Sequence, residues 1–372
     1  MGQRVIIVDF NHIAYAYSHS SFRLSERVLI NGKLEEVDTT IQTGAIKCIN
    51  RWANRGTNPT AVCFDSPVPG RKCYYAKAFD MGVDTDQEYK GGRSKMSNLL
   101  FDSITMSESL LRKGGVACFR AHNYEADDLI YACVKAAKRD YPGLPIDIIT
   151  NDADIVPLVD DTVSVFLRSK KNTWAEDKSI EKAHYIQIRP YNYQEVMQGL
   201  SAFNKFLMPY NTVLLHKLLR GDSADNINGI KKLFPPKKYN AMIEAMIADG
   251  LDIGNIFRYG DCIKHYCMRS TRTEVNEEYA LAHKSDCLVK FDNPVEYYNI
   301  LSVIEKYAEF TGEVERVKDF VGKMYLGMNL NQAYTGIGNI SRAPASITKP
   351  IPGYNFNSLK EACFADLRIR LD

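Results

Sequence analysis

Three short stretches in the first half of the chain are almost continuously apolar and rich in β-branched residues: Arg4–Asp9, Pro59–Asp65 and Ile146–Thr150. Runs of this kind are typical of strands buried on both faces of a parallel sheet. Two stretches with helical periodicity, Thr40–Arg55 and Glu125–Lys138, lie between them. Because strands and helices alternate, and a further strand is expected at Thr162–Leu167, the pattern predicts an α/β protein with a parallel sheet.

The second half of the chain has a different pattern. Its periodicity is helical, with candidate helices at Thr212–Leu219, Lys237–Ala248 and Ile300–Phe320. Residues 334–357 contain Gly, Ser, Pro and Asn with little periodicity, and a short amphipathic segment, Ser358–Leu371, follows. We therefore expect an α/β core at 1–190 with a polar, basic insertion at 66–120, a helical part at 191–330, and a linker or tail at 331–372.

Composition narrows the class of protein. The 372-residue chain is 45% hydrophobic and 25% charged, and no apolar run is long enough to span a membrane. The apolar run near the N-terminus is too short for a signal peptide, so we expect an intracellular protein whose nine cysteines are reduced thiols. The net charge of +2 suits a nucleic-acid enzyme in which an acidic site offsets basic binding surfaces.

Acidic residues stand at four points where a predicted strand ends or a predicted helix begins. They are Asp9 and Asp65 after the first two strands, Asp152 and Asp154 after the third, and Glu125, Asp127 and Asp128 at the helix start. The carboxyl ends of parallel strands form the ligand crevice of an open sheet. We therefore expect these side chains to converge on one place.

A carboxylate cluster of this size repels itself unless cations neutralise it. Oxygen-only ligands suit hard ions such as Mg²⁺ or Mn²⁺, and two such ions about 4 Å apart support in-line phosphoryl displacement. Each acid on its own is also compatible with a helix cap or a solvated loop residue, but together they favour a metal site. Asp128 stays open between a supporting role at that site and an interaction with the helix N-terminus.

A fifth acidic element lies in the helical half. Gly221 and Gly229 bracket the segment G-D-S-A-D-N-I-N-G-I, in which Asp222 and Asp225 are three residues apart. Its backbone amides, with basic residues following, suit a phosphate backbone and not base edges. The candidate contacts are Gly221, Ser223, Gly229, Lys231 and Lys232. On its own, this segment is also compatible with a metal-free helix–loop–helix.

At these positions the chain resembles the 5′-nuclease family, which includes flap endonucleases, bacteriophage 5′–3′ exonucleases and the N-terminal nuclease domain of bacterial DNA polymerase I. The matching segments are V-D-F-N-H (8–12), F-D-S (64–66), Y-K-G-G-R (89–93), Y-E-A-D-D-L-I (124–130), T-N-D-A-D-I-V-P-L-V (150–159) and G-D-S-A-D-N-I-N-G-I (221–230). They occur in family order, and the phage branch is the most similar. The resemblance implies a PIN-like α/β nuclease core, an inserted arch, and a helical C-terminal portion with a helix–three-turn–helix motif.

The resemblance also implies the ligand set. One Mg²⁺ would be held by Asp9, Asp65, Glu125 and Asp127, and a second by Asp152, Asp154 and Asp222, with Asp225 in support. Mn²⁺ would substitute for Mg²⁺, and the loop at 221–230 would grip duplex DNA with a K⁺ ion on its carbonyls. The expected reaction is hydrolysis that leaves a 5′-phosphate and a 3′-hydroxyl.

The basic motif at 89–93 matches the family's arch. Lys90 and Arg93 would contact the scissile phosphate and stabilise its developing charge. Tyr89 is a candidate for stacking on unpaired bases, although packing in the core or in a lid explains it at least as well. Arg71 and Lys72 are further candidate phosphate contacts that do not align firmly. Without the resemblance, the sequence of this motif favours a solvated basic loop.

Two other functions remain open from the sequence: a PIN-type ribonuclease, and an inactive scaffold that binds branched DNA. The expected substrates are branched or nicked duplex DNA and RNA primers paired to DNA. We expect a monomer without membrane association, acting in the cytoplasm, or in the host cytoplasm if it is phage-encoded. The segment Ser358–Leu371 could bind a replication clamp or a single-strand binding protein, pack back on the body of the protein, or stay mobile. The group Cys262, Cys267, His283 and Cys287 is too loosely spaced to favour zinc.

Overall fold

The computed structural model describes residues 2–20, 23–67, 96–122, 124–168, 185–189 and 345–371, with short strand segments between 221 and 342. The chain divides into two compact units. The first unit comprises Met1–Gly70, Lys95–Gly199 and Pro344–Asp372, and the second comprises Arg71–Ser94 and Leu200–Ala343. Of the helices in the described residues, none combines the length and the apolar composition that a bilayer span requires.

A six-stranded sheet forms the centre of the first unit. Its order is β5-β4-β1-β6-β7-β8. The strands are β1 (Val5–Asp9), β4 (Thr60–Cys63), β5 (Ala117–Phe119), β6 (Ile146–Thr150), β7 (Val163–Arg168) and β8 (Tyr185–Ile188). All neighbouring pairs are parallel except β7 with β8. The predicted α/β class and mostly parallel sheet are confirmed.

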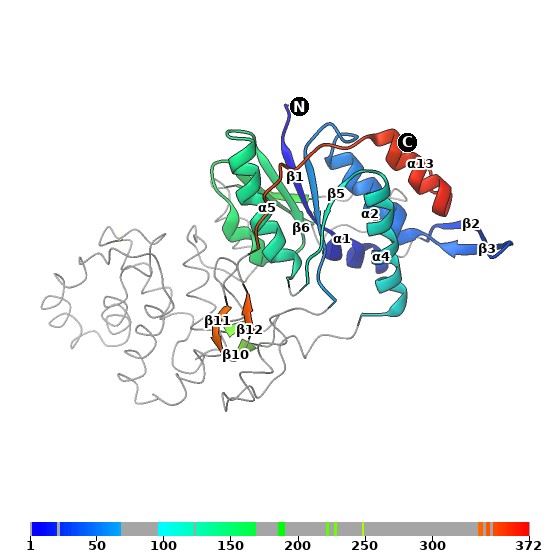
Figure 1. Ribbon diagram of the computed structural model, residues 1–372, viewed down its shortest axis with the longest axis horizontal. Coiled ribbons are helices and arrows are strands. Elements are labelled where there is room, and N and C mark those ends of the chain that lie inside the picture. The colour runs from blue at the N-terminus through cyan, green and yellow to red at the C-terminus, as the bar shows by residue number, and fades with distance from the viewer. Residues whose placement is uncertain are drawn as a thin grey trace, which may run out of the picture. The chain divides into compact units, whose positions relative to one another are not determined.

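Helices cover both faces of this sheet (Figure 1). Ile6 and Val8 of β1 share one buried cluster with α1 (Phe10–Ser18), α2 (Thr40–Trp52) and α4 (Asn98–Lys113). On the other face, α5 (Ala126–Asp140) contacts β1, β4 and β6. Strands covered on both sides are mostly apolar, which explains why β1 is apolar up to Asp9 and why β6 has only Asp147 and Thr150 as polar residues.

Several element boundaries differ from the predicted ones. The helix expected to reach Arg55 ends at Trp52, because Asn54 and Arg55 adopt left-handed backbone angles (φ 47° and 54°). The elements that were not predicted include α1, which starts directly after β1, and a hairpin of β2 (Ser25–Ile30) and β3 (Lys33–Asp38). The hairpin turns at Asn31-Gly32, both at positive φ, as two-residue hairpin loops require.

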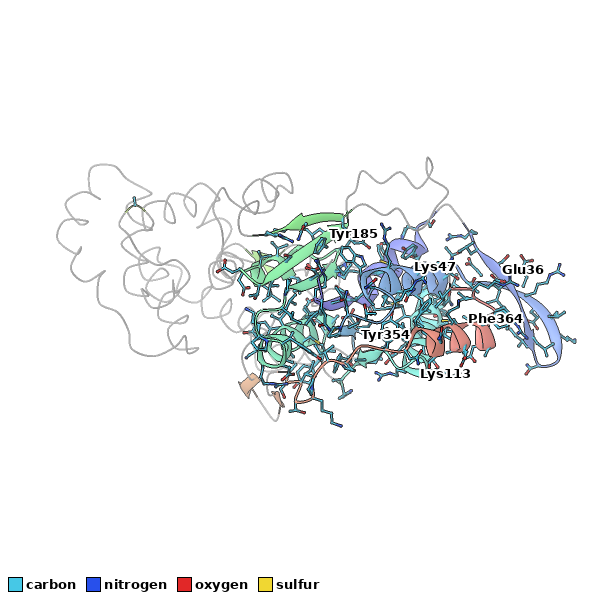
Figure 2. The ribbon with its side chains drawn as sticks, turned by 90° about the horizontal axis from the view of Figure 1, so that it is seen from above. Glu36, Lys47, Lys113, Tyr185, Tyr354 and Phe364 are labelled. Atoms are coloured by element: carbon cyan, nitrogen blue, oxygen red, sulfur yellow. The ribbon has the colours of Figure 1, made fainter. Side chains whose placement is uncertain are left out.

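The C-terminal segment packs on the first unit. Residues 345–355 lead into α13 (Phe356–Leu367), which contacts α4 and β2. The Thr60 amide at the start of β4 donates to the Pro352 carbonyl at 3.0 Å, and the Tyr354 amide donates to the Gly56 carbonyl at 3.1 Å. Gly56 has φ +84°, and an added Cβ there would lie 2.1 Å from the Tyr354 carbonyl oxygen, so this crossing requires glycine. Figure 2 shows Tyr354 where the segment reaches α13 and Lys113 beside that helix.

Two predicted ranges need correction. The insertion expected at 66–120 is shorter, because residues 98–113 form α4 and residues 117–119 form β5 of the central sheet. Residues 331–372 were expected to form a linker or tail. From residue 345 on, where the structure describes this range, the segment is packed, and Leu359 and Cys363 are fully buried. Of the alternatives for Ser358–Leu371, packing back on the body is the one observed.

In the second unit the structure describes two short antiparallel strand pairs. β9 (Gly221–Asp222) pairs with β10 (Ile227–Asn228), and β11 (Tyr334–Ile337) pairs with β12 (Ile340–Arg342). The first pair lies in the loop for which a helix–three-turn–helix motif was predicted, and that motif is not confirmed. The candidate helices after residue 190 and the discounted zinc group lie outside the described residues.

Candidate metal centre

Asp9 sits where the central strand ends and a helix begins. It is the last residue of β1 and caps α1, since its Oδ1 accepts from the His12 amide at 3.4 Å. Its other oxygen accepts from the Thr150 hydroxyl, at the end of β6, at 2.8 Å. Asp9 is fully buried, so these contacts hold a carboxylate that is out of contact with water.

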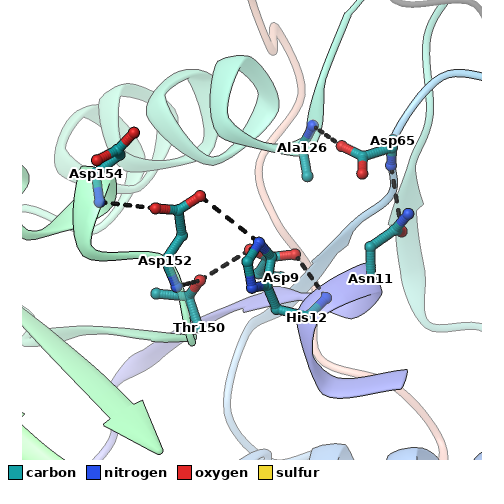
Figure 3. A network of polar contacts seen from close by, with 8 residues as sticks. All are labelled: Asp9, Asn11, His12, Asp65, Ala126, Thr150, Asp152 and Asp154. Carbon is teal, nitrogen blue, oxygen red and sulfur yellow. Dashed lines mark hydrogen bonds and ion pairs between the residues drawn. The ribbon is translucent and has the colours of Figure 1, made fainter. Parts of the chain in front are cut away.

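Asp65 follows the neighbouring strand β4 and is held through three groups, of which Figure 3 shows the contacts with Ala126 and Asn11. Its carboxylate Oδ1 accepts from the Ala126 amide at the start of α5, at 2.8 Å. Its amide donates to the Asn11 side-chain oxygen at 3.4 Å, and its carbonyl accepts from the Arg120 Nη1 at 2.9 Å. The contacts tie the end of β4 to α1, to α5 and to the loop after β5.

Asp152 and Asp154 follow β6 on the opposite side of β1. Asp152 caps a short 3₁₀ helix, η1 (Ala153–Leu158): its Oδ1 accepts from the Asp154 amide at 2.8 Å. The Asp152 amide in turn donates to the Thr150 hydroxyl at 2.9 Å. Thr150 therefore touches both Asp9 and Asp152, and it fixes the spacing between the ends of β1 and β6.

The three acids at the start of α5 differ in role. Glu125 is the N-cap residue and is buried. Asp128, also buried, accepts from the Glu125 amide at 2.9 Å through Oδ2, which is the reciprocal half of a capping box. Between the two alternatives left open for Asp128, this contact favours interaction with the helix N-terminus. Asp127 is partly exposed in the same turn.

His12 lies in the motif V-D-F-N-H (8–12), and the sequence alone predicted no role for it. Its Nε2 lies 3.8 Å from Asp9 Oδ2 and 3.6 Å from Asp152 Oδ2, so the imidazole stands between two candidate ligands (Figure 3). The available signal was its spacing of three residues from Asp9 at a helix start. Thr150, Asn11 and Arg120 were also given no role, because their contacts to Asp9 and Asp65 join residues 54 to 141 positions apart in the sequence.

Buried thiols next to the site have a packing role. Cys63 lies two residues before Asp65, and its sulfur is 3.7 Å from that of Cys133 on α5. Burial, followed by the contact with Cys133, raises the pKa of the Cys63 thiol well above its ordinary value. A thiol that stays protonated is a poor metal ligand and a poor nucleophile, so these cysteines belong to the core.

The donor chemistry fits a hard cation, although convergence on one ion is not observed. Among the described residues, no three His, Cys, Asp or Glu side chains lie close enough to hold a metal together. The candidates nevertheless offer only carboxylate oxygens, and Asp9 and Glu125 are buried at 0% and 3% exposure. Such oxygens suit Mg²⁺ or Mn²⁺, and buried carboxylates need compensating charge. The two-ion ligand set stays a prediction.

Other predicted site residues fall outside the described residues: Tyr89, Lys90, Arg93, Arg71, Lys72, Ser223, Asp225, Gly229, Lys231 and Lys232. For Gly221 and Asp222 only the strand pairing is described. A cavity of about 210 Å³, lined by His19, Arg23 and Asp38 among others, contains none of the candidate ligands. The candidate site is therefore defined by the strand ends and not by that hollow.

The mostly parallel sheet has acids at or just after the ends of β4, β1 and β6 and at the start of α5, which is the arrangement expected for a nuclease core of the α/β class. Residues 4–184 match the family model described as "5'-3' exonuclease, N-terminal resolvase-like domain". The resemblance stated from the motifs is thereby confirmed.

Relatives with this domain differ in length. A 5′-3′ exonuclease of Mycoplasma pneumoniae is 23% identical over 313 residues, covering 82% of this chain and 96% of that protein. DNA polymerase I of Bacillus caldotenax is 26% identical over 301 residues, covering 80% of this chain and 29% of that protein. DNA polymerase I of Caldicellulosiruptor bescii is 32% identical over 230 residues, covering 61% and 23%. The chain thus spans less than a third of each of these polymerases.

Solved structures with a similar arrangement are more distant. The T5 5′-exonuclease with bound divalent metal ions (zinc) gives a TM-score of 0.46 at 16% identity, covering 84% of this chain and 98% of that one. Human GEN1 in complex with Holliday junction DNA gives a TM-score of 0.36 at 12% identity, covering 98% and 91%.

Proposed function

We propose that the protein is a structure-specific 5′-nuclease that acts as a 5′–3′ exonuclease and flap endonuclease on branched or nicked DNA. The observation that carries this proposal is the placement of Asp9, Asp65 and Asp152 at the carboxyl ends of three neighbouring strands, β1, β4 and β6. These strands lie within the part of the chain that matches the 5′-3′ exonuclease family model. RNA primers paired to DNA are a further substrate of the same chemistry.

The carboxylates of the proposed site are held in place by hydrogen bonds that do not depend on a bound metal. Thr150 and the His12 amide hold Asp9, the Ala126 amide orients Asp65, and the Asp154 amide orients Asp152. The proposed ligands are Asp9, Asp65, Glu125 and Asp127 for one Mg²⁺ and Asp152, Asp154 and Asp222 for a second, with Asp225 in support. When bound, two such ions activate water and neutralise the charge on the leaving oxygen. Mn²⁺ would substitute for Mg²⁺.

Substrate contacts belong to the proposal as well. Lys90 and Arg93 would neutralise the scissile phosphate, with Tyr89, Arg71 and Lys72 nearby in sequence. The 221–230 loop, followed by Lys231 and Lys232, would bind the duplex backbone. The backbone carbonyls of this loop would also bind a K⁺ ion. Because backbone contacts carry no base information, the enzyme would recognise structure and not sequence, and binding would weaken steeply with salt.

The remaining assignments complete the proposed picture. The proposed domain organisation is a nuclease core with an inserted arch within residues 66–120, a helical part and a C-terminal segment. We expect a monomer in the cytoplasm. A replication clamp or single-strand binding protein is a proposed partner, and it would have to dock on the outward surface of α13, since the inward residues Leu359 and Cys363 are buried.

The test is cleavage of two substrates side by side. A 5′-flap duplex and a single-stranded RNA are incubated with the wild-type protein, in Mg²⁺ or in EDTA. Asp152→Ala removes a candidate ligand, and Asp161→Ala, at an exposed acid in the loop before β7, is the matched control. We expect Mg²⁺-dependent flap cleavage that is lost in the first variant and kept in the second.

The other outcomes separate the alternatives. Cleavage of the RNA alone would identify a PIN-type ribonuclease. Tight flap binding without cleavage by the wild-type protein would identify a scaffold. Full cleavage by Asp152→Ala would remove the proposed metal site.

A further inference from the structure

Arg120 lies in the loop between β5 and α5, one residue after the strand ends. Its Nη1 donates to the carbonyl oxygen of Asp65 at 2.9 Å, and its Nε donates to Glu108 Oε2, on α4, at 2.7 Å. The guanidinium thus bridges two segments that are distant in the sequence. One of these segments carries a candidate metal ligand.

The same guanidinium stacks on the residue before that ligand. Arg120 Cζ lies 5.2 Å from the centroid of the Phe64 ring, and Phe64 stacks on Phe10 with ring centroids 4.7 Å apart. Both rings are fully buried. Phe10 follows Asp9 and Phe64 precedes Asp65, so one stack of three planar groups sets the separation between two candidate ligands.

Asp65 depends on this support because it stands beyond the end of its strand. β4 ends at Cys63, so the sheet ladder does not hold the Asp65 carbonyl. The planar, rigid fork of arginine can hold a carbonyl and a carboxylate at once, whereas the single ammonium of lysine lacks that geometry. Outer partners of metal ligands commonly fix the orientation of those ligands in this way.

We propose that Arg120 is a positioning residue for the metal centre: it fixes the backbone of Asp65 and thereby the direction in which the Asp65 carboxylate meets the ion. This inference rests on the proposed function, since it assigns a role within the same site. Its basis is the contact to the Asp65 carbonyl together with the stack on Phe64.

A neighbouring arginine provides a matched control. Arg112 also binds Glu108, through Nε at 3.0 Å and Nη2 at 2.8 Å. Among the described residues it does not contact Asp65. Arg112→Met therefore removes an ion pair with Glu108 but leaves the Asp65 carbonyl bond intact, while Arg120→Met removes both. Arg120→Lys keeps the charge and loses the fork.

The primary measurement is the dissociation constant of Mn²⁺ alone, from the electron paramagnetic resonance signal of the free ion during titration of the full-length protein. Mutation of outer partners of metal ligands typically weakens metal affinity about 10–100-fold. We expect Arg120→Met and Arg120→Lys to weaken Mn²⁺ binding by about 10-fold or more, and Arg112→Met by less than about 2-fold. The Mg²⁺ concentration for half-maximal flap cleavage should rise in parallel, with kcat at saturating Mg²⁺ less affected.

Two results would overturn the inference. One is an Arg120→Lys variant that binds Mn²⁺ as tightly as wild type, which would show that charge alone suffices. The other is equal weakening by Arg112→Met and Arg120→Met with equal losses of Tm, which would reduce Arg120 to a structural ion pair with Glu108. Failure of the proposed function itself looks different: the wild-type protein would then neither bind Mn²⁺ nor cleave the flap.

Discussion

The packing of the C-terminal segment on the first unit predicts a large effect from a single substitution, Leu359→Ala. Leu359 is fully buried on α13. It fits against Gly114 at the end of α4, where an added Cβ would lie 2.6 Å from Leu359 Cδ1 and 2.7 Å from its Cα. Gly114 has no side chain that could move into the space left by the leucine side chain, and its backbone is fixed at the end of α4. The cavity created by Leu359→Ala therefore stays open.

The expected cost follows from this geometry. Substitution of a buried leucine by alanine costs about 2–5 kcal/mol, and the cost is higher where the site cannot collapse. A loss of about 3 kcal/mol should lower Tm by roughly 6–12 °C for a unit of this size. The matched control is Leu99→Ala on α4, where the leucine is 61% exposed and the expected change is within about 0.5 kcal/mol.

The assay is thermal unfolding followed by circular dichroism, combined with hydrogen exchange at the Thr60 amide, which donates to the Pro352 carbonyl. We expect Leu359→Ala to speed exchange at Thr60, because loosening α13 loosens the segment that precedes it. Equal Tm values for Leu359→Ala and Leu99→Ala, with unchanged exchange at Thr60, would refute the packing described for 345–371.

Three further predictions concern groups in the first unit. Thr150→Val removes the hydroxyl that joins Asp9 to Asp152, so Mn²⁺ affinity should fall about 10-fold or more, and an unchanged titration would show that this bridge is not needed. Burial outweighs the ion pair with Arg4 and raises the pKa of Asp147, so the contribution of this group to stability should be largest below the ordinary aspartate pKa and should fall as pH rises through the raised value. In urea unfolding from about pH 4 to about pH 7, the stability of wild type relative to Asp147→Asn should fall as pH rises; an identical pH dependence in the two proteins would contradict the assignment. Alkylation by iodoacetamide, followed by mass spectrometry, should label the half-buried Cys48 before Cys63 and Cys133, whose burial, with the raised pKa of Cys63, protects them until the protein unfolds.

The predictable part of the fold is the part with a strong local signal. The continuous apolar runs of β1 and β6 predicted both strands within one residue, and the acids that follow them located the candidate site. β5 was missed because a three-residue strand, Ala117–Phe119, has too few positions to show a period. α1 was missed because it begins directly after β1, with Asp9 serving both as strand end and as cap.

The unpredictable part depends on contacts between distant segments. Residues 345–355 have little periodicity because they are held by backbone bonds to Gly56 and Thr60 and not by a regular apolar face. Arg120 and Thr150 gain their roles from partners at Asp65 and Asp9, which are 55 and 141 residues away in the sequence. A single sequence gives no measure of such pairings.

The most direct test of the metal-centre account compares two buried aspartates on neighbouring strands. Asp9 ends β1 at the carboxyl end of the sheet, while Asp147 lies near the start of β6 and pairs with Arg4 at 2.6 Å; their exposed fractions are 0% and 1%. Both are replaced by asparagine, and Mg²⁺-dependent cleavage of a 5′-flap duplex is measured. We predict that Asp9→Asn loses more than about 100-fold of the activity, beyond the 10–100-fold typical for outer partners of metal ligands, while Asp147→Asn stays close to wild type. Comparable activity in the two variants would contradict a metal centre at the ends of the strands.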